Sequence, residues 1–274
     1  LSRRKMLLQT PVHISRSLFV INPSDRILFV GSCFADNIGQ KLTSNKFKTV
    51  VNPYGVMYNP VSVRHTVERY IAENSGAEGV DIAVFTLGTN HVYILNETGE
   101  IVDNCQKRPQ RLFTERELTV EECADALSIA MDSLWKLNAE TRIILTVSPI
   151  RYAKYGFHGS RLSKATLLLA SEKLLHQYDR VSYFPAYEIM NDELRDYRFY
   201  RPDMLHPSEQ AVDYIFEKFR EAYFSKDSIR FYDEWQPIQR ALQHRPFNQD
   251  SEEYKQFLLQ TKQSEMAFRS RWNV

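Results

Sequence analysis

The sequence predicts an α/β protein: a three-layer αβα sandwich with a mostly parallel five-stranded sheet, plus a helical C-terminal extension. Two observations predict this fold class. Short apolar runs alternate with longer segments of helical periodicity, the pattern of successive βαβ units with helices on both faces of the sheet. At 274 residues, 43% of them hydrophobic, the chain is also long enough to bury the core of such a domain.

The expected strands are five short apolar runs that end at turn residues. The run "DRILFVG" is bounded by charge at one end and glycine at the other, and "KTVVNPYG" is stopped by an Asn-Pro pair. The expected strands lie within residues 25–31, 48–55, 81–90, 141–150 and 181–190.

The expected helices lie between and after those strands, at residues 35–47, 61–74, 119–138, 160–178 and 206–224. Thr119 is a good N-cap for the third helix, and Glu122 completes a capping box. The fifth helix is expected to start at Pro207, because proline is favoured in the first turn. Residues 96–113 interrupt the alternation, and the turn residues in "NETGE" favour a hairpin there.

This order of elements divides the chain into three parts. They are an N-terminal extension (1–20), a main domain (20–225) and a charged helical extension (226–274). The last part is expected to pack back on the main domain or to mediate contact between copies of the chain, and the oligomeric state stays open.

Composition excludes several classes of function. A net charge of +1 gives no electrostatic reason to bind nucleic acid or an anionic membrane surface. No apolar run reaches the roughly 20 residues that span a bilayer, and the basic segment "LSRRKMLLQTPV" lacks the apolar core of a signal peptide.

The cysteines at 33, 105 and 123 form neither a disulfide framework nor a C-x-x-C zinc motif. Free thiols suit a reducing compartment, so a cytoplasmic location is expected, although a chain that starts at Leu1 is also compatible with a trimmed leader.

Residues that can carry chemistry follow the expected strands. The carboxyl ends of parallel strands share one edge of the sheet, where ligands bind. The stretch "ILFVGSCFADNIG" places two nucleophilic side chains, Ser32 and Cys33, after the first strand. The stretch "RPDMLHPS" places Asp203 three residues before His206, a spacing that lets the carboxylate orient the imidazole. The alternative is that Asp203 only caps the next helix and that His206 is an ordinary surface residue.

Two further residues can stabilise an oxyanion. Gly55, after the second strand, can offer its backbone N–H, and Asn90, after the third, can offer its side-chain amide. The alternative is that both are turn residues, selected for their backbone conformation.

This order of motifs resembles the SGNH (GDSL-like) hydrolase superfamily, and "GSCFA" itself resembles the signature of the GSCFA family. The similarity covers roughly residues 20–225, which it identifies as an SGNH-like, flavodoxin-like catalytic domain. Further stretches that resemble the family are "NCQKRP", "TVSPIRY", "LSKATLLLA" and "LRDYRFYRPDMLHPS". Gln106 departs from the pattern, in which a histidine is expected after the cysteine.

The resemblance implies a nucleophile, a D-x-x-H dyad and an oxyanion hole. The predicted activity is therefore that of a hydrolase or acyltransferase acting on a small-molecule or carbohydrate acyl ester or thioester, with no cofactor and no metal. Two alternatives remain: an esterase that uses Ser32, and a non-catalytic ligand-binding or scaffold protein that keeps the fold.

Spacing favours Cys33 over Ser32 as the nucleophile. Aligning "GSCFADN" with the superfamily pattern G-D-S-x-x-x-N matches Gly31 and Asn37 and puts Cys33 at the nucleophile. A thiol at a helix N-terminus near a histidine is readily activated, and Ser32 one residue earlier suits an N-cap. The Cys33 N–H is then a further oxyanion donor.

Other residues near the expected edge are candidates for lining the pocket, and each can equally be an ordinary solvated or buried residue. These candidates are His91, Cys105, Arg151, Tyr152 and His158. Arg or His at the mouth of the site suits an anionic or polyhydroxyl substrate.

Overall fold

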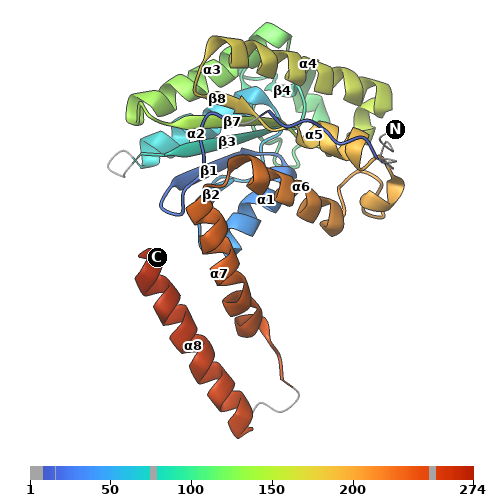
Figure 1. Cartoon of the computed structure of the whole chain (residues 1–274). Coiled ribbons are helices and arrows are strands. Elements are labelled where there is room, and N and C mark those ends of the chain that lie inside the picture. The colour runs from blue at the N-terminus through green and yellow to red at the C-terminus, as the bar shows by residue number, and fades with distance from the viewer. Residues whose placement is uncertain (1–8, 16, 75–78, 247–250) are drawn as a thin grey trace, which may run out of the picture.

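The computed structural model describes residues 9–15, 17–74, 79–246 and 251–274 (Figure 1). Within them, five parallel strands form one sheet in the order β2–β1–β3–β7–β8, which confirms the predicted fold class. These strands are β1 (Arg26–Gly31), β2 (Lys48–Val51), β3 (Ile82–Leu87), β7 (Arg142–Val147) and β8 (Val181–Tyr183). The predicted N-terminal extension (1–20) lies partly outside the described residues.

Helices cover both faces of this sheet (Figure 1). One face carries α2 (Pro60–Glu73), α3 (Val120–Leu137) and α4 (Gly156–Gln177), and the other carries α1 (Cys33–Ser44) and α6 (Glu209–Tyr223). Alternate residues of a strand point to opposite faces. In β1, Ile27 and Phe29 therefore enter one core while Leu28 and Val30 enter the other, which explains why the buried strand is a continuous apolar run.

Capping residues decide where the helices begin. The predicted capping box of Thr119 and Glu122 is present at α3. The prediction that the last core helix starts at Pro207 was wrong, because Ser208 is the N-cap of α6 and the proline lies before it. Helix α1 starts at Cys33, which confirms Ser32 as its N-cap and adds two residues to the helical stretch predicted from residue 35. Helix α4 starts four residues earlier than predicted, at Gly156, without a side-chain cap.

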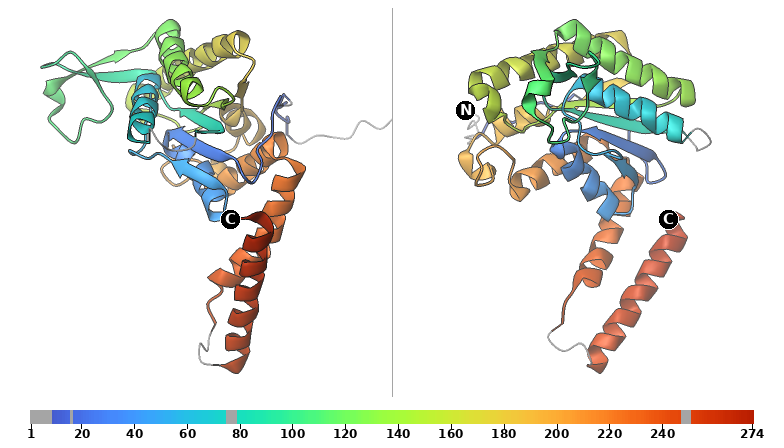
Figure 2. Two further views of the ribbon diagram at one scale, coloured as in Figure 1. Left: turned by 90° about the vertical axis from the view of Figure 1, so that its left-hand side faces the viewer. Right: turned by 180° about the vertical axis from the view of Figure 1, so that it is seen from behind.

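The interruption after β3 is larger than the hairpin predicted from residues 96–113. Among the described residues it is a three-stranded antiparallel sheet in the order β5–β4–β6, with β4 (His91–Leu95), β5 (Ile101–Val102) and β6 (Phe113–Glu117). The hairpin between β4 and β5 is present, but the pairing of β4 with β6 was not predicted. This small sheet projects from the side of the sandwich (Figure 2, left).

The predicted C-terminal helices form an antiparallel pair, α7 (Lys226–Gln243) and α8 (Glu252–Trp272), that extends away from the sandwich (Figures 1 and 2). The base of this pair is fixed to α1, where Trp235 Nε1 donates to the Ser44 carbonyl oxygen at 2.9 Å. In the part of the chain that is described, no helix is both long and apolar enough to cross a membrane.

Candidate active site

The site is built around the elbow at which β1 turns into α1. Gly31 has a φ of +149°, and a Cβ at this position would lie 2.2 Å from the Thr86 carbonyl oxygen of β3. Its N–H donates to Asn52 Oδ1 at 2.8 Å, and its carbonyl accepts from the Met57 N–H at 2.8 Å. Only glycine fits this close approach of β1, β3 and the loop after β2.

Ser32 closes the elbow. It is the N-cap of α1: its Oγ accepts from the Phe34 N–H at 3.3 Å, and its own N–H donates to the Thr86 carbonyl at 3.0 Å. The residue is 0% exposed. Its hydroxyl therefore serves the helix start and is shut off from solvent.

Cys33, the first residue of α1, is partly exposed. Its Sγ lies 3.8 Å from the hydroxyl of Tyr58, which comes from the loop after β2. Burial is the largest of the causes that raise the pKa of Tyr58 to about 12, and the neighbouring Cys33 adds a smaller contribution. This phenol therefore keeps its proton at neutral pH.

The backbone and ring of Tyr58 are held in place. Its carbonyl accepts hydrogen bonds from the Gly88 and Thr89 N–H groups, both at 2.8 Å. Its ring packs edge-to-face on Tyr152, with centroids 6.2 Å apart. The hydroxyl is thus presented to Cys33 from a rigid loop.

Asp203 and His206 form a pair, with Asp203 Oδ2 2.6 Å from His206 Nδ1. The other carboxylate oxygen accepts from the Leu205 and His206 N–H groups at 2.9 and 3.0 Å. These backbone hydrogen bonds, and then the bond to the imidazole, lower the pKa of Asp203 to about 2. The ionised carboxylate accepts the Nδ1 proton and leaves Nε2 as the proton-accepting atom of the ring.

The pair sits on the carboxyl-end edge of the sheet. The N–H of Arg151, which follows β7, donates to the Leu205 carbonyl at 3.1 Å. Within the described residues, no hydrogen bond joins Cys33 to His206.

The two predicted oxyanion donors are engaged elsewhere. The N–H of Gly55 donates to the Asn52 carbonyl at 2.9 Å, in a turn where Gly55 has a φ of +93°. Asn90 is 1% exposed, and its Nδ2 donates to the Leu118 carbonyl at 2.8 Å.

Two of the other predicted pocket residues, His91 and Cys105, lie in or beside the small antiparallel sheet, and Tyr152 packs against Tyr58. His91 is buried and stacks on Tyr155 with centroids 3.6 Å apart, and desolvation lowers its pKa. Burial also raises the pKa of Cys105, near the charges of Lys154 and Glu115. Tyr152 is partly buried, its ring packs edge-to-face on Tyr58, and desolvation raises its pKa.

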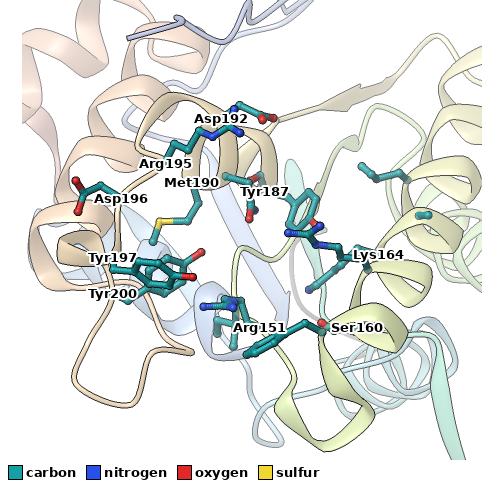
Figure 3. Close-up of a pocket in the computed structure, with 16 residues that line it drawn as sticks. Arg151, Ser160, Lys164, Tyr187, Met190, Asp192, Arg195, Asp196, Tyr197 and Tyr200 are labelled. Atoms are coloured by element: carbon teal, nitrogen blue, oxygen red, sulfur yellow. The ribbon is translucent and has the colours of Figure 1, made fainter. Parts of the chain in front are cut away.

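The remaining two candidates, Arg151 and His158, differ in exposure and surroundings. His158 is exposed in the first turns of α4. Arg151 lines a pocket of about 700 Å³ that the sequence did not predict. This pocket lies between α4 and the segment from α5 (Ala186–Glu188) to Tyr200 (Figure 3).

Lys164 is the most notable residue that sequence reasoning missed. It is 1% exposed, and its Nζ donates to the carbonyl oxygens of Gly88 and Ser148, both at 2.7 Å. Burial lowers the pKa of Lys164 to about 7. The available signal was a lysine three residues before Leu167, on the face of α4 that carries the apolar core positions.

Tyr58 and Asn52 were missed as well. Asn52 bridges the elbow, since its Oδ1 accepts from Gly31 and its Nδ2 donates to Asp36 Oδ1 at 2.7 Å. Both residues belong to the loop that follows the second strand, so the rule that placed Gly55 at the site could have found them. Among the described residues, no group of three or more His, Cys, Asp or Glu side chains is placed to hold a metal ion.

Comparison with family models supports the resemblance inferred from the motifs. The model described as the GSCFA family matches residues 26–80 and 73–219. A second model, described as the GSCFA domain protein C-terminal domain, matches residues 235–271, a region that the sequence motifs did not reach. A comparison with curated proteins finds no match.

Several solved structures are similar to this chain. A GDSL-like lipase from Bacteroides thetaiotaomicron is 13% identical, with 72% of this chain and 87% of that chain covered and a TM-score of 0.46. A carbohydrate esterase family 3 protein from Talaromyces cellulolyticus is 12% identical, with 76% and 98% covered and a TM-score of 0.44. A family 3 carbohydrate esterase from Clostridium thermocellum is 12% identical, with 81% and 100% covered and a TM-score of 0.42. These values are too low for the likeness to say anything about activity.

Proposed function

The chain belongs to the GSCFA family, and from that premise we propose that it is an acyl ester or thioester hydrolase, or an acyltransferase, with Cys33 as its nucleophile. One observation carries the proposal. A partly exposed thiol at the first position of α1 and an assembled Asp203–His206 pair lie on the same carboxyl-end edge of a parallel sheet.

The proposed reaction has two steps. In the first, Cys33 Sγ attacks the acyl carbon, the thiol proton passes to His206 Nε2, and that proton leaves with the departing alcohol or thiol. In the second, His206 Nε2 takes a proton from water or an acceptor alcohol as its oxygen attacks the thioester carbon. The C–S bond then breaks, the carboxylic acid or new ester leaves, and the proton returns from His206 to Cys33 Sγ. Asp203 stays ionised throughout and orients the imidazole.

For the oxyanion we propose the Cys33 N–H and the Tyr58 hydroxyl. The N–H groups of a first helical turn lack intrahelical acceptors, and the Tyr58 hydroxyl lies 3.8 Å from Sγ. Asn90 Nδ2 retains a second hydrogen for such a contact, whereas the Gly55 N–H would first have to leave the Asn52 carbonyl.

The two rival functions are less well supported. An esterase that uses Ser32 needs a solvent-accessible hydroxyl, but this residue is buried and caps α1. A scaffold protein without turnover has no need of an Asp203–His206 pair whose carboxylate accepts three hydrogen bonds.

The test is turnover of short-chain p-nitrophenyl esters and acyl thioesters. We expect Cys33→Ala and His206→Ala to lower kcat/KM by a factor on the order of 10³ or more. An acyl adduct on the peptide that contains Cys33 is expected when the reaction is quenched early.

The matched control is Ser32→Ala. It removes the N-cap and should lower the free energy of unfolding by about 1 kcal/mol while most turnover is kept. Full activity in Cys33→Ala would rule out the thiol mechanism. Full activity in Cys33→Ala combined with none in Ser32→Ala would establish the serine alternative.

A further inference from the structure

The pocket of about 700 Å³ does not contain Cys33 or the Asp203–His206 pair, but it adjoins the loop that carries the pair. Arg151 makes the connection. It lines the pocket, its N–H donates to the Leu205 carbonyl at 3.1 Å, and its Nη1 donates to the Met204 carbonyl at 3.0 Å.

The Arg151 guanidinium is held in one place. Its central carbon lies 4.1 Å from the ring centroid of Phe157 and 5.2 Å from that of Tyr200, and both rings line the pocket. In Figure 3 the guanidinium points into the space between Tyr200 and Lys164. Four of its five N–H donors are free of the Met204 contact, so it is a preorganised fork for an acidic group.

The charge of the lining is positive. Four basic side chains, Arg151, Arg161, Lys164 and Arg195, face two acidic ones, Asp192 and Asp196. Asp196 is partly neutralised by Arg198 at 3.6 Å. Among the described residues, Arg161 and Arg195 form no ion pair with a carboxylate.

We propose that this pocket binds an anionic group, a phosphate or a carboxylate, carried by the substrate or acyl acceptor that reacts at Cys33. The reaction at Cys33 rests on the proposed function; the anion site itself does not. An apolar acyl chain is a poorer occupant, because it would desolvate the guanidinium groups without replacing their hydrogen bonds. The tyrosine and phenylalanine rings favour a ring attached to the anion.

Lys164 provides a second way to detect a bound anion, through the uptake of a proton. Its ammonium group is held by the Gly88 and Ser148 carbonyls in the wall of the pocket. A nearby negative charge favours the protonated form of a buried lysine. Binding of an anion near neutral pH should therefore be accompanied by proton uptake, seen as a dependence of the binding enthalpy on the buffer.

The test is calorimetric titration of the full chain with three probes that share one ring: phenyl phosphate, benzoate and phenol. We expect at least one of the two anions to bind at least about tenfold more tightly than phenol, and the tighter anion identifies the group. Its affinity should fall with added salt.

Variants locate the site. Arg151→Gln, and separately the double variant Arg161→Gln with Arg195→Gln on the rim, should each weaken anion binding by about tenfold or more. Arg240→Gln, which removes an exposed arginine of α7 far from the pocket lining, is the matched control and should change nothing. The double variant keeps the test decisive if Arg151→Gln does not fold.

The inference is overturned if neither anion binds better than phenol, or if Arg240→Gln weakens binding as much as the pocket variants. Cys33→Ala separates the two proposals, because it should lose turnover but keep anion binding. Anion binding without turnover in the wild-type protein would contradict the proposed function and leave the anion site standing.

Discussion

Ser32 and Cys33 are neighbours in the chain, but their environments differ completely. The Ser32 hydroxyl is buried and bonded to the first turn of α1, whereas the Cys33 thiol is partly exposed and faces a phenol. A one-residue step along the chain therefore separates a buried capping hydroxyl from a partly exposed thiol.

Tyr58 is predicted to act on the reacting atoms. Tyr58→Phe should lower kcat on the order of tenfold to a hundredfold, with little change in KM, because a donor to the developing oxyanion is lost. The measurement is steady-state turnover of p-nitrophenyl acetate. Tyr54→Phe is the control from the same loop, since the Tyr54 hydroxyl bonds to Glu73. Equal kcat in wild type and Tyr58→Phe would exclude the role.

Asp203 is predicted to link stability to pH. Its pKa of about 2 lies below the ordinary value of 3.8, so folding favours the carboxylate. The contribution of the Asp203 carboxylate to the free energy of unfolding is fully present above about pH 4 and is lost as the pH falls towards about 2. The urea midpoint of Asp203→Asn should therefore lie below that of the wild type near pH 6, and the gap should narrow near pH 3. Asp132→Asn, an exposed change on α3, should show no such narrowing. A constant gap for Asp203→Asn would contradict the assignment.

At the scale of elements, Lys164 connects two strands that already lie side by side. Its ammonium group, carried by α4, donates to the carbonyls that follow β3 and β7, at Gly88 and Ser148. These carbonyls lie at the carboxyl edge, where the chain leaves the sheet and backbone acceptors would otherwise be unpaired. These two hydrogen bonds thus fix the position of α4 relative to the ends of β3 and β7.

Lys164 should give the free energy of unfolding a distinct pH dependence. Its pKa of about 7 lies below the ordinary 10.5, so between these values the folded state binds fewer protons than the unfolded state. Stability therefore rises with pH over that range, on the order of 1 kcal/mol per pH unit. Relative to Lys164→Met, the wild-type protein should gain stability between about pH 7 and pH 9. Lys173→Met, an exposed change on the same helix, should show no such trend. If the difference in the free energy of unfolding between the wild type and Lys164→Met does not change with pH, the predicted effect of Lys164 is refuted.

At the scale of the whole molecule, the C-terminal helices are anchored at one end. Phe231 and Trp235 of α7 are buried, and Phe268 of α8 packs on both, with ring centroids 4.9 and 5.1 Å away. The rest of the pair extends from the sandwich (Figure 1). The aromatic cluster therefore makes the two helices part of the same folded unit as α1.

Phe268→Ala is predicted to destabilise the whole chain. Phe268 is 4% exposed, so the change should lower the free energy of unfolding by about 3 kcal/mol. Leu259→Ala, on the same helix but 62% exposed, should cost less than about 0.5 kcal/mol. Chemical denaturation followed by circular dichroism measures both. Equal effects would show that α8 is not packed as described.

Much of the fold could be predicted because its signals are local. The strand order along the chain, the capping box at Thr119 and the helical C-terminus all follow from periodicity and capping within short windows. The start of α6 was misplaced because Pro207 and Ser208 both suit a helix start, and only the hydrogen bond to Ala211 decides between them.

By itself, the sequence determined the alternation of strands and helices, the adjacency of Ser32 and Cys33, and the spacing of Asp203 and His206. These depend on a few consecutive residues. Only the tertiary structure decided which donors are free, that Tyr58 meets Cys33, and that Arg151, Lys164 and Tyr200 share one pocket. Such contacts join segments that are distant in the chain, so packing of the whole core, and not local propensity, sets them.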